Sequence, residues 1–161
     1  MTICTHGRAC LFGAVVDGAM VLSRAGVIAY ERWLALPDHH AGVELDAFVV
    51  MPNHVHGIVL LVGTGPALSG PAPQIENVTK TDNAGVVPTQ PSGNVSLSTV
   101  IGSYKSGVTR CIHEQGLVTG GRLWQGRYHD HIIRNPRDLG RIREYVVYNP
   151  GRWQADVFYR A

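Results

Sequence analysis

The sequence predicts a single-domain α+β fold, and three observations lead to that prediction. Segments rich in β-branched and other apolar residues alternate with two longer segments in which apolar residues recur at helical spacing. The pair Asp17-Gly18, between two short apolar segments, is typical of a tight hairpin turn. The chain has 161 residues, of which 45% are apolar, and this is enough for one buried core. We therefore take residues 1–161 as one domain.

The first half of the chain predicts a strand, a hairpin, a helix and two further strands. Ser23 can cap the helix with its hydroxyl, and Pro37 ends it after Leu36. Pro52-Asn53 has the composition of a tight turn between the last two strands. These elements are expected at residues 2–6, 11–22, 23–36, 43–51 and 54–62.

An abrupt change of composition follows the last of these strands. Residues 63–96 are rich in Gly, Pro, Ser, Thr and Asn and contain few large apolar residues. Such a composition cannot bury enough apolar surface to fold, so we expect a flexible insertion within the one domain.

The second half predicts a helix, a strand and a last helix. Ser96 or Ser98 can cap the first helix, which extends to about residue 115 and carries one apolar stripe. Residues 127–134 predict a strand. The last helix is expected over residues 136–149, since proline is favoured at the start of a helix and Pro150 ends it.

The elements thus follow the order β-α-β-β-α-β, with a small N-terminal hairpin and a C-terminal helix. This order is typical of the ferredoxin-like arrangement, in which helices pack on one face of an antiparallel four-stranded sheet and the other face is available. Many unrelated functions occur on such a fold, so function must be argued from individual residues.

Composition argues against several classes of protein. There is no run of about 18 apolar residues and no secretory pattern at the N-terminus, so we expect a cytoplasmic protein that does not enter the membrane. Cys4, Cys10 and Cys111 are odd in number and lack zinc-site spacing. This favours reduced thiols over a disulfide framework.

Positive charge is concentrated in the second half of the chain. The net charge is +2, but residues 1–97 carry a net charge of −3 and residues 98–161 carry +5. Most of the basic residues in the second half are arginines, whose planar group suits phosphate. An anion would therefore bind in that half, and an ordinary solvated basic surface is the alternative.

His54 and His56 are the most informative residues of the sequence. Alternate side chains of a strand share one face, at about 3.3 Å per residue, so the two imidazoles should emerge roughly 6.6 Å apart. They can hold a divalent metal if further ligands join them. The candidates for a third ligand are Asn149, His131, His129 and Asp130. Oxygen ligands would suit Mg²⁺ or Mn²⁺ and a third nitrogen would suit zinc, whereas a polar strand face that binds nothing is the alternative.

Four ordered motifs carry a resemblance to a known family. They are Leu45–Gly57 (with Met51-Pro52-Asn53-His54-Val55-His56), Ile101–Ser106, Leu123–Asn135 and Ile142–Trp153. Together they resemble the REP-associated tyrosine transposases, which are single-strand DNA transposases with a His-hydrophobic-His motif and one catalytic tyrosine. The resemblance covers nearly the whole chain apart from the insertion.

This resemblance implies a ferredoxin-like nuclease fold in which His54 and His56 hold Mg²⁺ or Mn²⁺. It assigns the nucleophile to Tyr145, in the pattern Tyr-x-x-x-Asn-Pro, and it places Asn149 where related enzymes have a third metal ligand. Tyr145 and Asn149 are four residues apart on a helix and so share a face.

We expect His131 either to support the metal ligands or to lie on the sheet face beside them, and not to bind the metal. Lys105, Arg127 and Arg134 are the expected contacts to the DNA backbone. The expected partner is single-stranded or hairpin DNA, bound by a monomer or a homodimer.

We therefore expect a transposase that cuts and rejoins single-stranded DNA at palindromic hairpins through a 5′-phosphotyrosine intermediate. Two other hypotheses stay open at this point. One is a remnant that binds DNA hairpins without cutting them, and the other is a structural domain whose histidines bind nothing.

Overall fold

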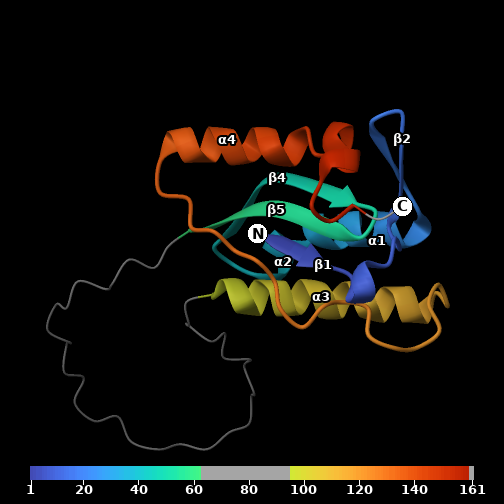
Figure 1. The fold of residues 1–161 in the computed structure, drawn as a ribbon. Coiled ribbons are helices and arrows are strands. Elements are labelled where there is room, and N and C mark those ends of the chain that lie inside the picture. The colour runs from blue at the N-terminus through green and yellow to red at the C-terminus, as the bar shows by residue number, and fades with distance from the viewer. Residues whose placement is uncertain (63–94, 160–161) are drawn as a thin grey trace, which may run out of the picture. The chain divides into compact units, whose positions relative to one another are not determined.

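The computed structural model describes residues 1–62 and 95–159 of the chain (Figure 1). The insertion predicted at 63–96 lies outside the described residues except for its last two. One of these, Ser96, accepts a hydrogen bond from Thr99 N and so caps the helix that follows. None of the described helices has both the length and the apolar character needed to cross a membrane.

The sheet is antiparallel and places β5 at its centre. Strand β5 (His54–Leu61) pairs with β4 (Val43–Met51) on one side and with β1 (Thr2–Cys4) on the other. The predicted strands at 43–51 and 54–62 are thus confirmed, to within one residue at the end of β5. A separate hairpin joins β2 (Gly13–Val16) to β3 (Ala19–Leu22). Asp17 and Gly18 both have positive φ, at 50° and 75°, as a tight hairpin turn requires.

The helices begin where the sequence predicts them. Helix α1 (Arg24–Leu34) is capped by Ser23, α3 spans Leu97–Glu114, and α4 (Pro136–Val147) is capped by Asn135. Pro37 does not simply end α1: it lies in the first turn of a short helix, α2 (Leu36–His39), because proline needs no N–H partner there. Pro150 likewise opens the 3-10 turn η2 (Pro150–Ala155), and η1 (His6–Arg8) is a second such turn.

The strand predicted at 127–134 is wrong. The segment only touches the edge of β1, through one isolated bridge between Thr2 and His129; a second bridge, between Thr5 and Trp124, lies just outside both. Strand β1 is three residues long and offers too short an edge for a full fourth strand. The segment nevertheless lies where the fourth strand of the predicted sheet would lie. The predicted fold class, α+β with an antiparallel sheet, is confirmed.

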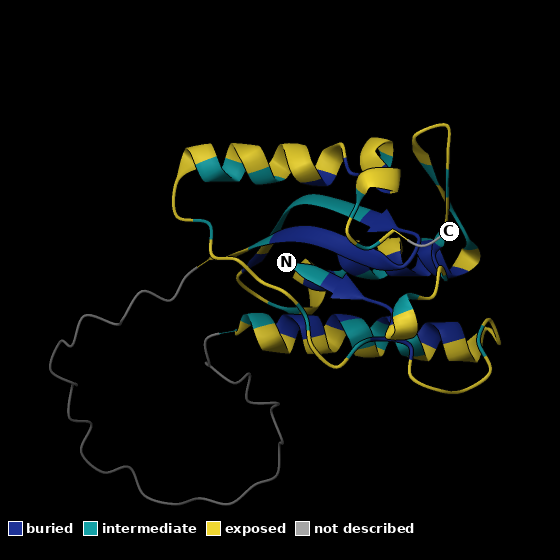
Figure 2. Ribbon diagram, in the orientation of Figure 1, coloured by how far each residue is buried: buried dark blue, intermediate teal, exposed yellow. Residues whose placement is uncertain are grey.

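The two faces of the sheet differ sharply, and β5 divides them. Val55 and Gly57 point toward α1 and α3: Val55 belongs to the apolar core, and a Cβ on Gly57 would lie 2.4 Å from the ring of Trp33. Because side chains alternate, His54 and His56 point the opposite way, toward α4. Helices α1 and α3 therefore cover one face as predicted, and α4 crosses the other (Figure 1). Figure 2 shows β5 buried and α4 largely exposed.

Candidate functional site

The two histidines of β5 are completely enclosed and directly face each other. His54 is 0% exposed and His56 is 3% exposed. Their Nε2 atoms are 2.9 Å apart, closer than the spacing of the strand alone suggests, because the two rings converge. Burial lowers the pKa of His54 to about 4, and burial together with the neighbouring His54 lowers that of His56 to about 3. Both imidazoles are therefore neutral near pH 7, which is the form that binds metals.

Asn53 fixes the orientation of the His54 ring. Its amide nitrogen donates to the carbonyl oxygens of Arg8 and Phe158, at 3.3 and 2.9 Å, so its Oδ1 must be the atom that faces His54. This oxygen can only accept, so the 2.8 Å contact requires a proton on His54 Nδ1. The Nε2 of His54 then presents a lone pair toward His56, as a metal-binding imidazole does.

Thr2 holds the other ring from β1. Its Oγ1 lies 2.8 Å from His56 Nδ1. When that nitrogen carries the proton, the Nε2 of His56 also presents a lone pair. In this tautomer the two lone pairs, 2.9 Å apart, repel unless a cation lies between them, so the donor set fits a divalent metal; in the other tautomer His56 Nε2 donates to His54 Nε2.

Asp156 joins the histidines from the C-terminal segment, and it is not among the predicted site residues. The ligand atoms of His54, His56 and Asp156 all lie within 4.8 Å of one another. Asp156 lies just after η2, in no helix or strand and outside every motif of the sequence. Its position as the first acidic residue after Tyr145 was the only available signal, and that signal is weak.

Asn149 is buried beside this carboxylate. It is 2% exposed, and its Nδ2 donates to Asp156 Oδ2 at 2.9 Å. Its Oδ1 is buried and has no hydrogen-bond partner among the described residues. A buried oxygen without a partner costs free energy, and a cation would satisfy it. The predicted ligand Asn149 thus lies next to the cluster, with a free oxygen.

Tyr145 extends from α4 to the same cluster. Its hydroxyl lies 3.4 Å from His56 Nε2 and 3.5 Å from Asp156 Oδ2. Burial and the Asp156 carboxylate raise the pKa of the phenol, while the Asn149 side chain opposes that rise. Tyr145 is nevertheless 42% exposed, so the hydroxyl reaches both the buried cluster and the surface. Tyr145, His56, Thr2 and His131 line one cavity of about 250 Å³.

The C-terminal segment covers the histidines. The Phe158 ring centroid is 4.7 Å from that of His54, and the Trp153 centroid is 5.9 Å from it. Arg8 holds this segment by donating to Val157 O at 3.0 Å, and its guanidinium lies over the Phe158 ring. Access to the imidazoles from this side therefore requires the segment to move.

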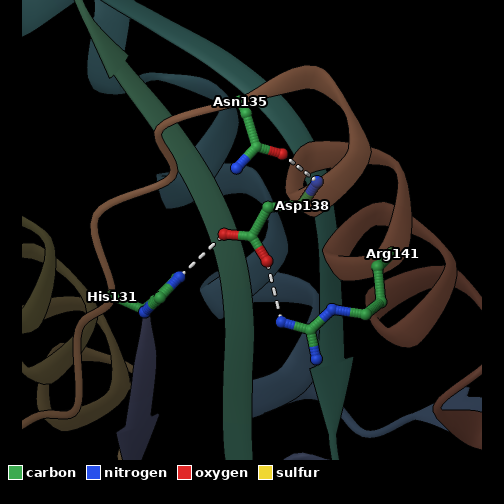
Figure 3. Close-up of polar contacts among 4 residues, drawn as sticks. All are labelled: His131, Asn135, Asp138 and Arg141. Atoms are coloured by element: carbon green, nitrogen blue, oxygen red, sulfur yellow. Dashed lines mark hydrogen bonds and ion pairs between the residues drawn. The ribbon is translucent and has the colours of Figure 1, made fainter.

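His131 has a partner other than the histidine cluster. Its Nε2 lies 2.8 Å from Asp138 Oδ2, and Arg141 binds the other oxygen of that carboxylate (Figure 3). Asn135 in turn accepts from Asp138 N, so the group also caps α4. Among the described residues His131 makes no hydrogen bond to His54 or His56. It lines the cavity beside Tyr145 instead of supporting the imidazoles.

The three basic residues predicted to contact DNA lie in different surroundings. Lys105 is partly buried, and its Nζ donates to Gln125 O at 2.7 Å, which ties α3 to the segment along β1. Burial lowers its pKa. Arg127 and Arg134 are exposed, on the segment between α3 and α4. The last two are free to meet a large ligand, whereas Lys105 has a structural contact to give up.

Comparison with known proteins adds one sequence relative and one structure. No family model matches the chain. The chain is 30% identical over 159 residues to an uncharacterized protein of Haemophilus influenzae, in an alignment that covers 99% of this chain and 83% of that protein. It is similar, with a TM-score of 0.56 and 19% identity, to the structure of a REP-associated tyrosine transposase bound to a REP hairpin. That match covers 92% of this chain but 63% of the solved chain, and at this identity it establishes the fold.

Proposed function

We propose that this chain, which belongs to the same family as the uncharacterized Haemophilus influenzae protein, is a metal-dependent enzyme that cuts and rejoins single-stranded DNA at hairpin elements. The similarity in fold to a transposase with a bound hairpin supports the class of substrate. Tyr145 is the proposed nucleophile, and His54, His56 and Asn149 are the proposed metal ligands. Asp156 is added to this set as a further oxygen ligand.

One observation carries the proposal: a tyrosine hydroxyl meets a buried histidine pair and a carboxylate. The histidines precede residues 63–94 in the sequence and Tyr145 follows them, yet the Tyr145 hydroxyl is 3.4 Å from His56 Nε2. A site for a purely structural role has no need to combine two neutral imidazoles, an amide oxygen without a partner and a half-exposed phenol.

The proposed reaction balances without an external energy source. The Tyr145 oxygen attacks the phosphorus of a phosphodiester, the bond from phosphorus to the 3′ oxygen breaks, and a 5′-phosphotyrosine and a free 3′-OH result. The phenol proton passes to the Asp156 carboxylate, which lies 3.5 Å away, and from there to solvent, while the departing 3′ oxygen takes up a proton from water to become the 3′-OH. Attack by another 3′-OH on the phosphotyrosine reverses these steps and joins strands.

The phenol needs activation, since its pKa is raised. A divalent metal bound by His54 and His56 would polarise a phosphoryl oxygen of the substrate and stabilise the charge that develops there. The neutral state of both imidazoles near pH 7 leaves them able to bind it.

The test is a covalent adduct between protein and DNA. A hairpin oligonucleotide with a single-stranded flank and a 3′-end label is incubated with the protein and Mn²⁺ or Mg²⁺, then separated under denaturing conditions. We expect a labelled protein band that Tyr145→Phe abolishes and EDTA prevents. Tyr148→Phe is the matched control, because Tyr148 is 60% exposed and makes no side-chain hydrogen bond to a described residue. An adduct that persists in Tyr145→Phe would exclude this nucleophile.

A second candidate function is hairpin binding without cleavage. The burial of both imidazoles favours it, because Phe158 and Trp153 cover His54 and a phosphate cannot reach that ring unless the C-terminal segment moves. The same assay separates the two: binding of the hairpin with no adduct under any metal would support the second candidate.

A further inference from the structure

A cationic groove lies on the far side of the sheet from the histidines. It runs between the α1–α2 corner and α3, and α1 and α3 cover the face of the sheet opposite α4. Its volume is about 550 Å³. The polar side chains that line it are Arg32, His39, His40, Ser103, Ser106 and Arg110. The proposed reaction uses none of them.

Every ionisable side chain in this lining, apart from the phenol of Tyr104, is a base. No aspartate or glutamate lines the groove, and neither Arg32 nor Arg110 forms an ion pair with an acidic side chain of the described residues. An ordinary basic surface has acidic side chains interspersed, whereas two arginines, two histidines and two serine hydroxyls here surround one hollow. The groove therefore presents donors and positive charge without counter-charge.

A contact to α3 holds the Arg32 side chain across the groove before any ligand binds. Its guanidinium reaches from α1 to α3, where one nitrogen donates to Cys111 Sγ at 2.9 Å. It passes Gly107, at which even a Cβ would lie 3.7 Å from the Arg32 side chain. One donor is thus used for positioning, and the other N–H groups of the fork remain for a ligand.

His40 has a buried ring nitrogen whose hydrogen-bonding capacity is not used. Its Nε2 is buried and has no hydrogen-bond partner among the described residues. Buried polar atoms nearly always have a partner. Because His40 lines the groove, a phosphate oxygen there can supply that partner when the ring turns toward it and Nε2 carries the proton.

We propose that this groove is a second phosphate-binding site. A phosphate offers several oxygens that can accept from an arginine fork, an imidazole and serine hydroxyls together, and these are the donors that line the groove. The phosphate can belong to the DNA backbone or to a small phosphate-containing molecule. The DNA form rests on the proposed function, while the small-molecule form does not.

The experiment follows amide and histidine ring resonances of the full chain by NMR. The protein is titrated in parallel with inorganic phosphate and with an unlabelled DNA hairpin. We expect saturable shifts of His40, Ser106 and Gly107 with phosphate, and about tenfold weaker binding in Arg110→Ala. Arg110→Lys should restore part of the affinity, because the charge returns without the fork. Arg122→Ala is the matched control: it removes the same charge from an exposed arginine outside the groove.

The outcomes separate the sources of the phosphate. Two results assign the site to the DNA backbone. The hairpin shifts the resonances of these residues, and Arg110→Ala lowers by about one the magnitude of the slope of log K against log salt concentration for hairpin binding. Shifts with inorganic phosphate alone assign it to a small phosphate compound. Absence of shifts with both ligands, or shifts that Arg110→Ala leaves unchanged, overturns the proposal. None of these readings depends on an adduct at Tyr145, so the two proposals fail separately.

Discussion

Helices α3 and α4 lie on opposite faces of the same sheet and are packed in opposite ways. Helix α3 buries Val100, Ile101, Tyr104, Val108, Cys111 and Ile112, whereas α4 buries Val146 alone. Between them, β5 turns Val55 and Gly57 toward the apolar core, where Gly57 lies against Trp33 of α1, and turns His56 toward Tyr145 of α4. One face therefore holds the fold together, and the other holds the polar groups.

This difference explains why Tyr145 is on α4. A helix with six buried side chains cannot shift without exposing apolar area, at about 25 cal/mol per Å². A helix held mainly by one buried valine and polar contacts can move by small amounts at little cost. The proposed nucleophile thus lies on a helix that can adjust its position at little cost.

The largest expected effect comes from breaking the α3 side. Ile112 is 0% exposed, so Ile112→Ala removes buried methyl groups and leaves a cavity. We expect the free energy of unfolding to fall by about 2–5 kcal/mol, measured by urea denaturation. Val147→Ala on α4 is the control, since Val147 is 59% exposed and its loss should change stability by about 0.5 kcal/mol or less. Equal losses for the two variants would contradict the contrast between the helices.

A smaller effect is expected from metal binding on the α4 side. Mn²⁺ at about one hundred times its Kd should raise the free energy of unfolding by about 2.7 kcal/mol, because only the folded chain brings the ligands together. The double variant His54→Gln with His56→Gln should lose this increase, as read from thermal unfolding with and without Mn²⁺.

The control for the metal is a histidine outside the cluster. His113 is exposed on α3, and His113→Gln should keep the full response to Mn²⁺. Stabilisation by Mn²⁺ that survives in the double variant would place the metal elsewhere on the protein. This measurement requires no catalytic turnover, so it tests the ligands apart from the chemistry.

Sequence patterns predicted the elements well because the signals are local. The apolar segment of β5, the cap at Ser23, the cap expected at Ser96 or Ser98 and found at Ser96, and the Asp17-Gly18 turn each depend on a few neighbouring residues, and each is confirmed. The strand at 127–134 failed because strand formation depends on a partner edge, and β1 is three residues long. No local pattern reports the length of a distant strand.

The candidate site was predictable where a motif marks it and not elsewhere. The pair His54 and His56 and the spacing of Tyr145 from Asn149 are visible in the sequence, whereas Asp156 has no local pattern around it. Asn53 was predicted only as a turn residue, yet its side chain also sets the proton position on His54 and holds Phe158. Such roles arise from contacts between segments far apart in the chain.

The smallest expected effect concerns the ion pair that ties α4 to β4. Arg143 donates to both carboxylate oxygens of Asp46, which lies at an irregularity in the pairing of β4 with β5. The Arg143 hydrogen bond is the main cause that lowers the pKa of Asp46 below its ordinary 3.8. A carboxylate with a lowered pKa in the folded state adds stability at pH values above its unfolded pKa, and that stability is lost as the pH falls through the folded pKa.

Arg143→Gln tests this contribution. The variant should be slightly less stable than the parent chain above roughly pH 5, and the difference should shrink toward roughly pH 3, as measured by urea denaturation across that range. High salt should reduce the difference as well, because both partners are near solvent. Arg137→Gln, at an exposed arginine in the first turn of α4, controls for the loss of charge. A difference that grows as the pH falls would mean that Arg143 stabilises α4 by a contact other than Asp46. Helix α4 would then be held to the sheet by a contact outside this ion pair.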